Sequence, residues 1–227
     1  MRKVIGGAFI SLDGVVQAPG GPDEDTTGDF AHGGWMEPIF EEAVGHQVDT
    51  LFAGDFDLLL GRRTFDIFAA FWPFMPDDDP IAAKFAKAQK YVLTGSDAPL
   101  DWKGSHRLAD LDALAKVKAG DGPNLVIQGS STLYPQLLAR GLLDRLVLMI
   151  APITLGAGKR LFGAGVPAGA FKLIEHRLTP GGMAMATYEP AGQLKTGSFA
   201  KAEPTKAERL RRACMEAGDW CSWSLFG

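Results

Sequence analysis

The segment from Asn124 to Phe162 constrains the fold of this chain more than any other part of the sequence. It predicts a strand, a tight turn, a helix, a second strand and a glycine-rich loop, in that order. Residues 125–127 and 146–151 are apolar without interruption. Such runs are typical of strands that are buried on both faces of a parallel sheet. The chain is therefore expected to form an α/β fold.

The turn within this segment is a candidate phosphate site. Residues 129–131, Gly-Ser-Ser, turn the chain, Ser131 or Thr132 is expected to cap the helix that follows, and Gly141 ends it. A helix start presents unpaired backbone N–H groups and the positive end of the helix dipole, which together suit a phosphate. The competing interpretation is a simple chain reversal, since Gly and Ser end many strands.

Two further strands end in turns of the same kind. Residues 56–60 predict a buried strand that leads through residues 61–64, Gly-Arg-Arg-Thr, into a helix. Adjacent arginines suit a polyanion, although a solvated pair at a helix end is an equally good interpretation. Residues 91–93 predict a third strand, and Thr-Gly-Ser follows it at 94–96. Doubly wound sheets bind ligands beyond such strand ends.

The remaining pattern predicts a sheet that begins parallel and ends antiparallel. Residues 3–11 predict the first strand, in which Gly6 and Gly7 indicate close approach of a ligand or another backbone. Residues 17–34 are rich in Gly, Pro and acids and predict a long loop of the kind that forms lids. Helices are expected at 35–52, from Asp79 or Pro80 onward and from Asp110 to Gly120, and a hairpin is expected to join 171–178 to 183–188.

Composition excludes several classes of protein. The 227 residues are 46% hydrophobic and 22% charged, which is typical of an ordinary globular protein. The net charge of −4 gives no electrostatic reason to bind nucleic acid or an anionic membrane. No apolar run reaches membrane-spanning length, and Asp13 follows too early for a signal peptide, so a cytoplasmic location is expected. Cys214 and Cys221 form no metal-binding motif, so no metal site is predicted.

Residues 191–227 differ in composition from residues 1–190, which are expected to form one domain. Residues 193–204 are expected to be a linker before a short helix, whose capping box is Thr205 with Glu208. The apolar residues beyond this helix are expected either to dock, on the chain's own core or on a second subunit, or to belong to a largely disordered tail. They are Trp220, Trp223, Leu225 and Phe226.

Five motifs occur along the chain in a fixed order. They are SLDG at 11–14, GRRTF at 61–65, LTGS at 93–96, QGSSTLYPQLL at 128–138 and the segment 141–162. In these motifs the chain resembles the dihydrofolate reductase-like superfamily, and more closely the C-terminal reductase domain of the bifunctional riboflavin-biosynthesis deaminase/reductase. The resemblance implies a mixed sheet, mostly parallel with a C-terminal antiparallel hairpin and with helices on both faces. No zinc motif of a deaminase half is present, so a stand-alone reductase-like domain is expected.

The resemblance implies that NADPH binds across the ends of the strands and supplies the hydride, while the protein aligns its ring. It implies that Arg62 meets the 2′-phosphate of the adenosine, and that Arg63 and Thr64 meet the pyrophosphate. The other implied cofactor-binding residues are Gly61, where the backbone admits the ligand, Thr94, Gly95 and Ser96 at the adenosine, Gly129, Ser130, Ser131, Thr132 and Leu133 at the pyrophosphate, and Phe9, Ile10 and Val16 at the nicotinamide.

Asp13, Trp35 and Glu37 are the candidate catalytic residues. Trp35 could stack on a flat substrate ring, although a Trp at a helix start is more often part of the core. Asp13 belongs to an Asp-Gly pair, which is also ordinary turn chemistry. The helix acid that binds pterin in dihydrofolate reductases has no secure counterpart, since Glu37, Glu41 and Asp29 only lie in its neighbourhood. This argues against a folate enzyme.

The resulting expectation is an NADPH-dependent reductase that acts on a small heterocycle of pyrimidine or pterin type, similar to 5-amino-6-(5-phosphoribosylamino)uracil reductase. Lys159 and Arg160 are candidates for holding a substrate phosphate, and the family implies a homodimer. The alternatives are dihydrofolate reductase itself and a domain that binds NADPH without turnover. Residues 17–34 distinguish an enzyme from a binding module, because an enzyme should order this loop over cofactor and substrate.

Overall fold

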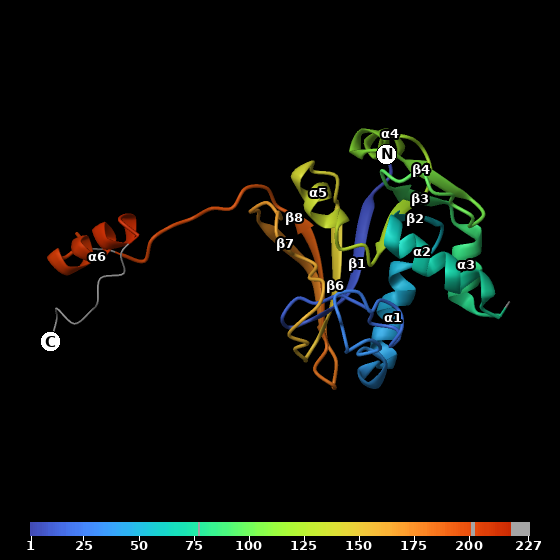
Figure 1. The fold of residues 1–227 in the computed structure, drawn as a ribbon, viewed down its shortest axis with the longest axis horizontal. Coiled ribbons are helices and arrows are strands. Elements are labelled where there is room, and N and C mark those ends of the chain that lie inside the picture. The colour runs from blue at the N-terminus through green and yellow to red at the C-terminus, as the bar shows by residue number, and fades with distance from the viewer. Residues whose placement is uncertain (77, 201–202, 219–227) are drawn as a thin grey trace. The chain divides into compact units, whose positions relative to one another are not determined.

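The computed structural model describes residues 1–76, 78–200 and 203–218 (Figure 1). The chain divides into two compact units, residues 1–193 and residues 194–227. An eight-stranded sheet organises the first unit. Its strands are β1 (Val4–Ser11), β2 (Phe56–Gly61), β3 (Lys90–Leu93), β4 (Ser105–Leu108), β5 (Asn124–Gln128), β6 (Arg145–Ala151), β7 (Phe171–Leu178) and β8 (Ala184–Pro190).

The sheet is mixed, with the strand order β4-β3-β2-β5-β1-β6-β8-β7. Strands β1 to β6 pair in parallel with one another, whereas β8 is antiparallel to both β6 and β7. β1 lies between β5 and β6, and in this register Gly7 stands beside Gln128 on one side and Val147 on the other. The predicted mostly parallel sheet with a C-terminal antiparallel hairpin is therefore confirmed.

Strand β4 was not predicted from the sequence. It reads Ser-His-Arg-Leu, and of its four residues Leu108 alone is buried. β4 forms the edge of the sheet and pairs with β3 alone, so its residues need not be apolar. A short polar edge strand leaves no apolar run by which a sequence pattern could identify it.

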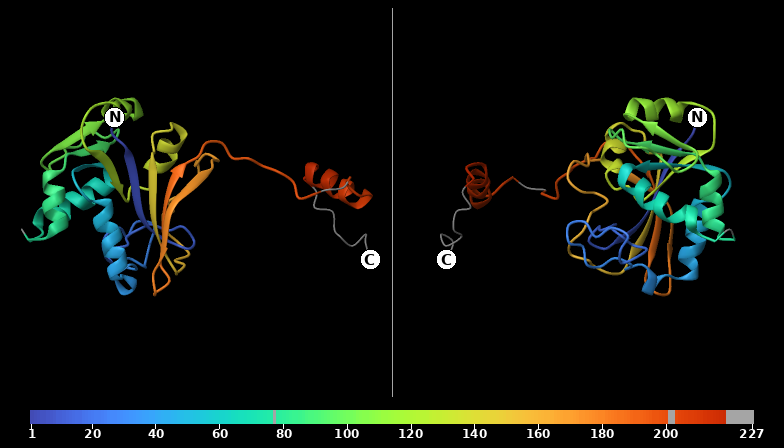
Figure 2. Two further views of the ribbon diagram at one scale, coloured as in Figure 1. Left: turned by 180° about the vertical axis from the view of Figure 1, so that it is seen from behind. Right: turned by 45° about the vertical axis from the view of Figure 1, so that its right-hand side comes forward.

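Helices cover both faces of the sheet, as predicted (Figures 1 and 2). On one face Leu114 and Tyr134 pack against Ile127. On the other face Leu51 and Phe85 belong to the cluster that contains Val126. The helices of the first face are α4 (Leu111–Ala119) and α5 (Leu133–Ala139), and those of the second are α1 (Glu42–Leu51), α2 (Arg62–Phe71) and α3 (Pro80–Lys87).

The helix predicted at 35–52 is shorter than the sequence pattern indicated. A 3-10 turn, η1 (Glu37–Ile39), comes first, Phe40 is extended with φ −73° and ψ 122°, and α1 begins only at Glu42. Pro38 lacks a backbone N–H, so it does not support a continuous helix through this segment. Trp35 precedes the break and is held in a turn, because its indole N–H donates to the Gln17 carbonyl at 2.8 Å.

The two glycines of β1 make room for side chains and not, as predicted, for a ligand or another backbone. A Cβ atom at Gly6 would lie 2.5 Å from Cε1 of Tyr134. A Cβ atom at Gly7 would lie 2.3 Å from Cδ2 of Leu51. Both distances are too short for real contacts, so a larger residue at either position would have to displace a side chain that α5 or α1 packs on the central strand.

Three of the predicted helix caps are formed. The Asp79 carboxylate accepts from the Ile81 and Ala82 amides at 2.9 and 2.8 Å, and Asp110 accepts from the Ala113 amide at 2.8 Å. In the second unit, the Thr205 hydroxyl accepts from the Glu208 amide at 3.1 Å and caps α6 (Lys206–Glu216). Of the two caps predicted for α5, Thr132 is wrong, because it has helical dihedral angles and its side chain accepts no capping hydrogen bond.

Some of the predicted features lie outside the described residues. They are Cys221 and the apolar group of Trp220, Trp223, Leu225 and Phe226. None of the helices in the described parts of the chain has the length and apolarity that crossing a membrane requires.

Candidate functional site

The carboxyl ends of the parallel strands form the edge at which the predicted cofactor residues gather. β2 and β5 are neighbours in the sheet and run in the same direction, so the turns that follow them lie side by side. α2 begins at Arg62, directly after β2, and α5 begins at Leu133, shortly after β5. Both helices therefore direct their amino ends to this edge, where helix starts favour anions.

Hydrogen bonds interlock the two turns. The Gly61 amide donates to the Ser130 hydroxyl at 2.9 Å, and the Ser130 amide donates to the Thr64 hydroxyl at 3.2 Å. Gly129 and Ser130 both have positive φ, 76° and 53°. Such a conformation is uncommon for Ser, and residues in unfavourable backbone conformations cluster at ligand sites. The structure thus brings together the two turns that the sequence singled out.

The two arginines of the first turn point to different parts of this edge. Nε of Arg62 donates to both carboxylate oxygens of Asp66, at 2.9 and 3.0 Å, and its NH1 donates to the Ala98 carbonyl at 2.9 Å. Arg62 therefore lies beside the chain that follows β3. NH1 of Arg63 instead reaches Thr27 Oγ1 at 3.5 Å, in the loop 17–34.

The turn after β3 is ordered by its own side chains. The Ser96 amide donates to the Thr94 hydroxyl at 3.1 Å, and the Ala98 amide donates to the Ser96 hydroxyl at 3.2 Å. Gly95 lies between them and is exposed. Because Arg62 donates to Ala98, the turn and this arginine form one surface.

Gln17 organises the loop 17–34 from its first residue. Its side chain is buried, and its amide nitrogen donates to the carbonyls of Asp25 and Thr27 at 2.8 and 2.9 Å. Its carbonyl oxygen accepts from the Lys159 amide at 3.0 Å. The Lys159 ammonium also pairs with the Asp25 carboxylate. Burial opposes ionisation of Asp25, but hydrogen bonds from Lys159 and Thr27 outweigh it and lower the pKa of Asp25.

Asp13 joins the end of β1 to the glycine loop after β6. Its carboxylate accepts from the Ser11 hydroxyl at 2.6 Å and from the amides of Leu155 and Gly156 at 3.0 and 2.8 Å. These hydrogen bonds, that from Ser11 foremost, lower the pKa of Asp13 to about 2. An ionised carboxylate with every oxygen engaged cannot donate a proton near neutral pH, so the contacts of Asp13 are those of a positioning residue. Nε of Arg160 donates to the Asp13 carbonyl at 2.8 Å.

Trp35 belongs to the core and not to a ligand surface. Its side chain is buried in a cluster with Val15, Phe30 and Met149, and its indole N–H is already bonded to Gln17. This placement corrects the expectation that Trp35 stacks on a flat ring. Trp35 contributes to the site only indirectly, because its hydrogen bond helps to hold Gln17, which in turn organises the loop 17–34.

The acids near the start of α1 have separate positions. Glu41 accepts from the Thr179 hydroxyl and from the Gly181 amide, the latter at 3.2 Å, and so ties α1 to the β7–β8 turn. Glu37 and Asp29 are exposed. None of these three carboxylates is a buried, unpaired acid of the kind that would bind the donor groups of a pterin.

The three residues predicted for the nicotinamide pocket lie on two faces of the sheet. Phe9 shares the α1 face and meets Phe40 edge to face, with ring centroids 6.4 Å apart. Ile10 and Val16 pack into the cluster on the α5 face. Successive residues of a strand point to opposite faces, so Phe9 and Ile10 cannot line one wall with their side chains.

Gln128, the last residue of β5, is a site residue that sequence reasoning did not select. Its Oε1 atom is buried and accepts no hydrogen bond among the described residues. It precedes Gly129 directly and stands beside Gly7 in the sheet register. A polar residue at the end of an otherwise apolar buried strand is the signal that could have identified it.

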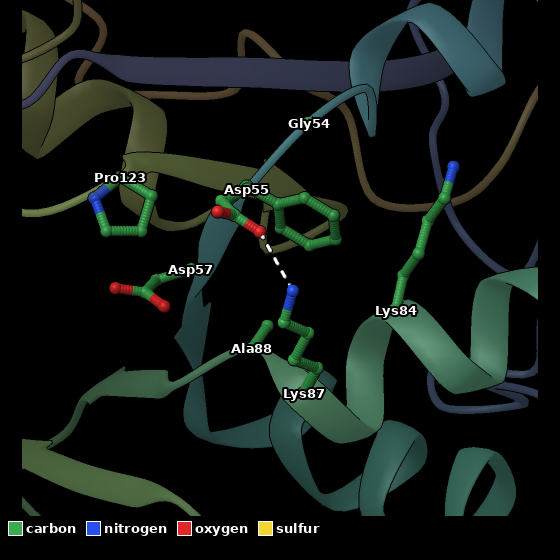
Figure 3. A pocket seen from close by; sticks show the side chains of 8 residues that line it. Gly54, Asp55, Asp57, Lys84, Lys87, Ala88 and Pro123 are labelled. Atoms are coloured by element: carbon green, nitrogen blue, oxygen red, sulfur yellow. Dashed lines mark hydrogen bonds and ion pairs between the residues drawn. The ribbon is translucent and has the colours of Figure 1, made fainter.

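A pocket lies at the opposite, amino edge of the sheet. It has a volume of about 470 Å³, and residues at the start of β2 and at the end of α3 line it (Figure 3). Lys87 pairs there with Asp55 at 3.1 Å, and Asp57 and Lys84 also face it (Figure 3). Its position separates it from the interlocked turns, so it is not part of the candidate site.

Comparisons with known proteins agree with the fold. A family model described as the RibD C-terminal domain matches residues 2–185. The protein YyaP of Bacillus subtilis, itself uncharacterized, is 25% identical over 172 residues, which are 71% of this chain and 80% of that protein.

Solved structures show the same architecture. A protein of Shewanella sp. PV-4 assigned to riboflavin biosynthesis has a TM-score of 0.61 at 23% identity, over 84% of this chain and 99% of that chain. A pyrimidine reductase-like protein of Corynebacterium diphtheriae has a TM-score of 0.53 at 16% identity, over 84% and 92%. Dihydrofolate reductase of Enterococcus faecalis, complexed with NADP(H), has a TM-score of 0.53 at 15% identity, over 83% and 96%. These likenesses establish a dihydrofolate reductase-like fold.

Proposed function

Since this chain belongs to the RibD C-terminal domain family, a family of reductases, we propose that it is an NADPH-dependent reductase of a small heterocycle. The substrate that we propose is of the pyrimidine type found in 5-amino-6-(5-phosphoribosylamino)uracil. The observation that carries the proposal is the pair of interlocked turns, in which Gly61, Thr64 and Ser130 are joined by hydrogen bonds at the carboxyl edge of the sheet.

The residues at this edge fit a dinucleotide. Gly129 and Ser130 both have positive φ in the turn before α5, a conformation in which successive backbone amides can face an anion. Arg62 lies at the β3 end of the edge, where a 2′-phosphate would meet it, and Arg63 lies toward the loop 17–34. NADPH, when bound, supplies the hydride, and the protein's part is to align the ring and exclude water.

The order of the loop 17–34 favours an enzyme over a module that binds NADPH without turnover. Gln17 and Lys159 fix the loop to the segment after β6 by side-chain contacts that are largely shielded from water. Arg63, which we propose binds the pyrophosphate of the cofactor, also contacts Thr27 of this loop. The same side chain therefore links the proposed cofactor site to the loop. A loop held in one conformation beside the cofactor edge can exclude water, which hydride transfer requires and simple binding does not.

The positions of the acids favour a pyrimidine substrate over dihydrofolate. Dihydrofolate reductases bind the pterin through a helix carboxylate, but Glu41 is occupied by Thr179 and Gly181, while Glu37 is exposed. A carboxylate available for two ring donors is therefore lacking among the acids at the start of α1.

Cofactor titration of three arginine variants tests the proposal. NADPH and NADH are titrated in parallel against the purified protein, with energy transfer from tryptophan to the nicotinamide as the signal. Arg62→Ala is expected to weaken NADPH binding about 10- to 100-fold and to change NADH binding little, because charged hydrogen bonds to the 2′-phosphate are lost. Arg63→Ala is expected to weaken both cofactors alike, because both carry the pyrophosphate.

Arg140→Ala provides the matched control. Arg140 ends α5 and pairs on the surface with Asp112, so its loss should leave both affinities unchanged. Equal losses of NADPH and NADH binding in Arg62→Ala would remove the 2′-phosphate assignment. A wild-type protein that binds neither cofactor would refute the reductase proposal as a whole.

A further inference from the structure

Gln128 carries a buried carbonyl oxygen that has no hydrogen-bond partner among the described residues. Leaving such a group unpaired costs about 1–3 kcal/mol, so buried polar atoms without partners are uncommon in folded proteins. Arg145 Nε is also buried without a hydrogen-bond partner among the described residues, but the guanidinium of that residue is already paired with Glu189 at 2.7 Å. For Gln128 the structure offers no such explanation.

The position of Gln128 places this oxygen beside the candidate site. It ends β5, and its side chain lies on the α1 face, where the missing Cβ of Gly7 would be 3.4 Å from Oε1. The next residue, Gly129, begins the interlocked turn. Phe9 stands two residues beyond Gly7 on the same face of β1. The carboxamide thus lies directly before the proposed cofactor turn, on the sheet face that also carries Phe9.

Two aromatic rings complete the surroundings on this face. Phe9 and Phe40 meet edge to face, and Phe40 remains 50% exposed. Aromatic side chains on this face offer contacts for the flat face of a ring, and the carboxamide of Gln128 offers contacts for its polar edge. A planar heterocycle has both.

We propose that Gln128 is a specificity-determining residue that pairs with a lactam edge of the substrate ring, accepting from a ring N–H and donating to the adjacent ring C=O. This inference rests on the proposed function and names the ring class that the site takes. A carboxamide offers one acceptor and one donor side by side, so it matches a neighbouring N–H and C=O. A carboxylate offers two acceptors and matches two donors, such as the N–H and amino group of a pterin. A carboxamide at this position therefore fits the lactam edge of a uracil-type ring, and a carboxylate would instead favour the two-donor edge of a pterin.

Lumazine and 1,3-dimethyllumazine test the hydrogen bond directly. Both are titrated by calorimetry into the protein saturated with NADP⁺, and in the second compound methyl groups replace both ring N–H groups, so that no lactam N–H remains. The wild type is expected to bind lumazine at least tenfold more tightly, since methylation leaves the Gln128 carbonyl unpaired. Gln128→Met, which is similar in size but has no amide, is expected to bind the two rings within about threefold of each other.

Gln128→Glu supplies the second arm, with pterin as the competing ring. Replacing the donor of the amide by a second acceptor is expected to shift the ratio of pterin to lumazine affinity at least tenfold toward pterin. Circular dichroism and urea denaturation establish that each variant is folded. An unchanged ratio in a folded Glu variant would overturn the inference, as would a Met variant that still discriminates against the methylated ring.

The outcomes separate this inference from the proposed function. Binding of NADP⁺ without selective binding of lumazine by the wild type refutes the role of Gln128 but leaves the reductase proposal intact. If Gln128→Met weakens NADP⁺ binding tenfold and leaves the lumazine ratio unchanged, Gln128 contacts the nicotinamide carboxamide and the inference is also wrong. Absence of cofactor binding in the wild type overturns both.

Discussion

Lys90 is a buried lysine whose charge opposes folding, and its replacement by Met should change how stability depends on pH. Its side chain is fully buried, and its ammonium lies 4.4 Å from the centroid of the Trp102 ring. It donates to the carbonyls of Ala86 and Lys103 at 3.3 and 3.1 Å. Burial lowers the pKa of Lys90 from 10.5 to about 8, while Asp57 opposes this shift.

The direction of the effect follows from proton binding. Between about pH 8 and pH 10.5 the unfolded chain holds the Lys90 proton and the folded protein does not, so stability rises with pH in this interval. One pH unit is worth about 1.4 kcal/mol when one proton separates the two states. From pH 7 to pH 10 the free energy of unfolding of the wild type should therefore rise by about 2 kcal/mol relative to that of Lys90→Met.

Urea denaturation at pH 7, 8.5 and 10 measures this difference in the free energy of unfolding. Other groups titrate in the same range, so the comparison is between wild type and variant at each pH. Lys87→Met is the control, because Lys87 is 80% exposed and pairs with Asp55 at the surface. Its profile should run parallel to that of the wild type. Parallel profiles for wild type and Lys90→Met would refute the reasoning.

Two further substitutions test the central strand and the loop that follows it. Gly6→Ala should destabilise the protein by about 1–3 kcal/mol in chemical denaturation, because its Cβ would overlap Tyr134. Tyr134→Leu should relieve part of that loss, and fully additive losses would contradict the overlap. Asp13→Asn should lower the thermal midpoint at pH 7, because the Leu155 and Gly156 amides lose a charged acceptor. The pKa of Asp13 is lowered to about 2, so this difference should shrink as pH falls from 4 to 2, and a constant difference would contradict the assignment.

Sequence patterns predicted the parts of the fold that depend on burial. Residues such as Leu59 and Val126 belong to uninterrupted apolar runs, which central parallel strands require on both faces. Aspartates at positions 79 and 110 predicted helix starts correctly, because a local hydrogen bond decides a cap. β4 was missed because an edge strand needs no apolar run. Trp35 was assigned to a helix because periodicity does not detect its hydrogen bond to Gln17.

The candidate site could be predicted only as far as chain direction determines it. Parallel strands carry their following turns to one edge, so the meeting of Gly61 and Ser130 was foreseeable. The contact of Lys159 with Asp25 joins positions far apart in sequence through side chains that tertiary packing orients. The same holds for Gly6, whose close neighbour is Tyr134 and not a ligand. The importance of Gln128 depends on an unpaired atom, which a sequence does not display.

The place of β1 in the sheet has a consequence for folding during synthesis on the ribosome. β1 is made first, yet its partners are β5 and β6, and Val4 pairs with Leu125, about 120 residues later. At synthesis rates of roughly 5–20 residues per second, the first strand waits on the order of ten seconds for its neighbours. During this time an apolar strand has two open edges, which are templates for aggregation. A nascent chain that stalls before Asn124 therefore lacks both partners of its central strand and should depend on chaperones.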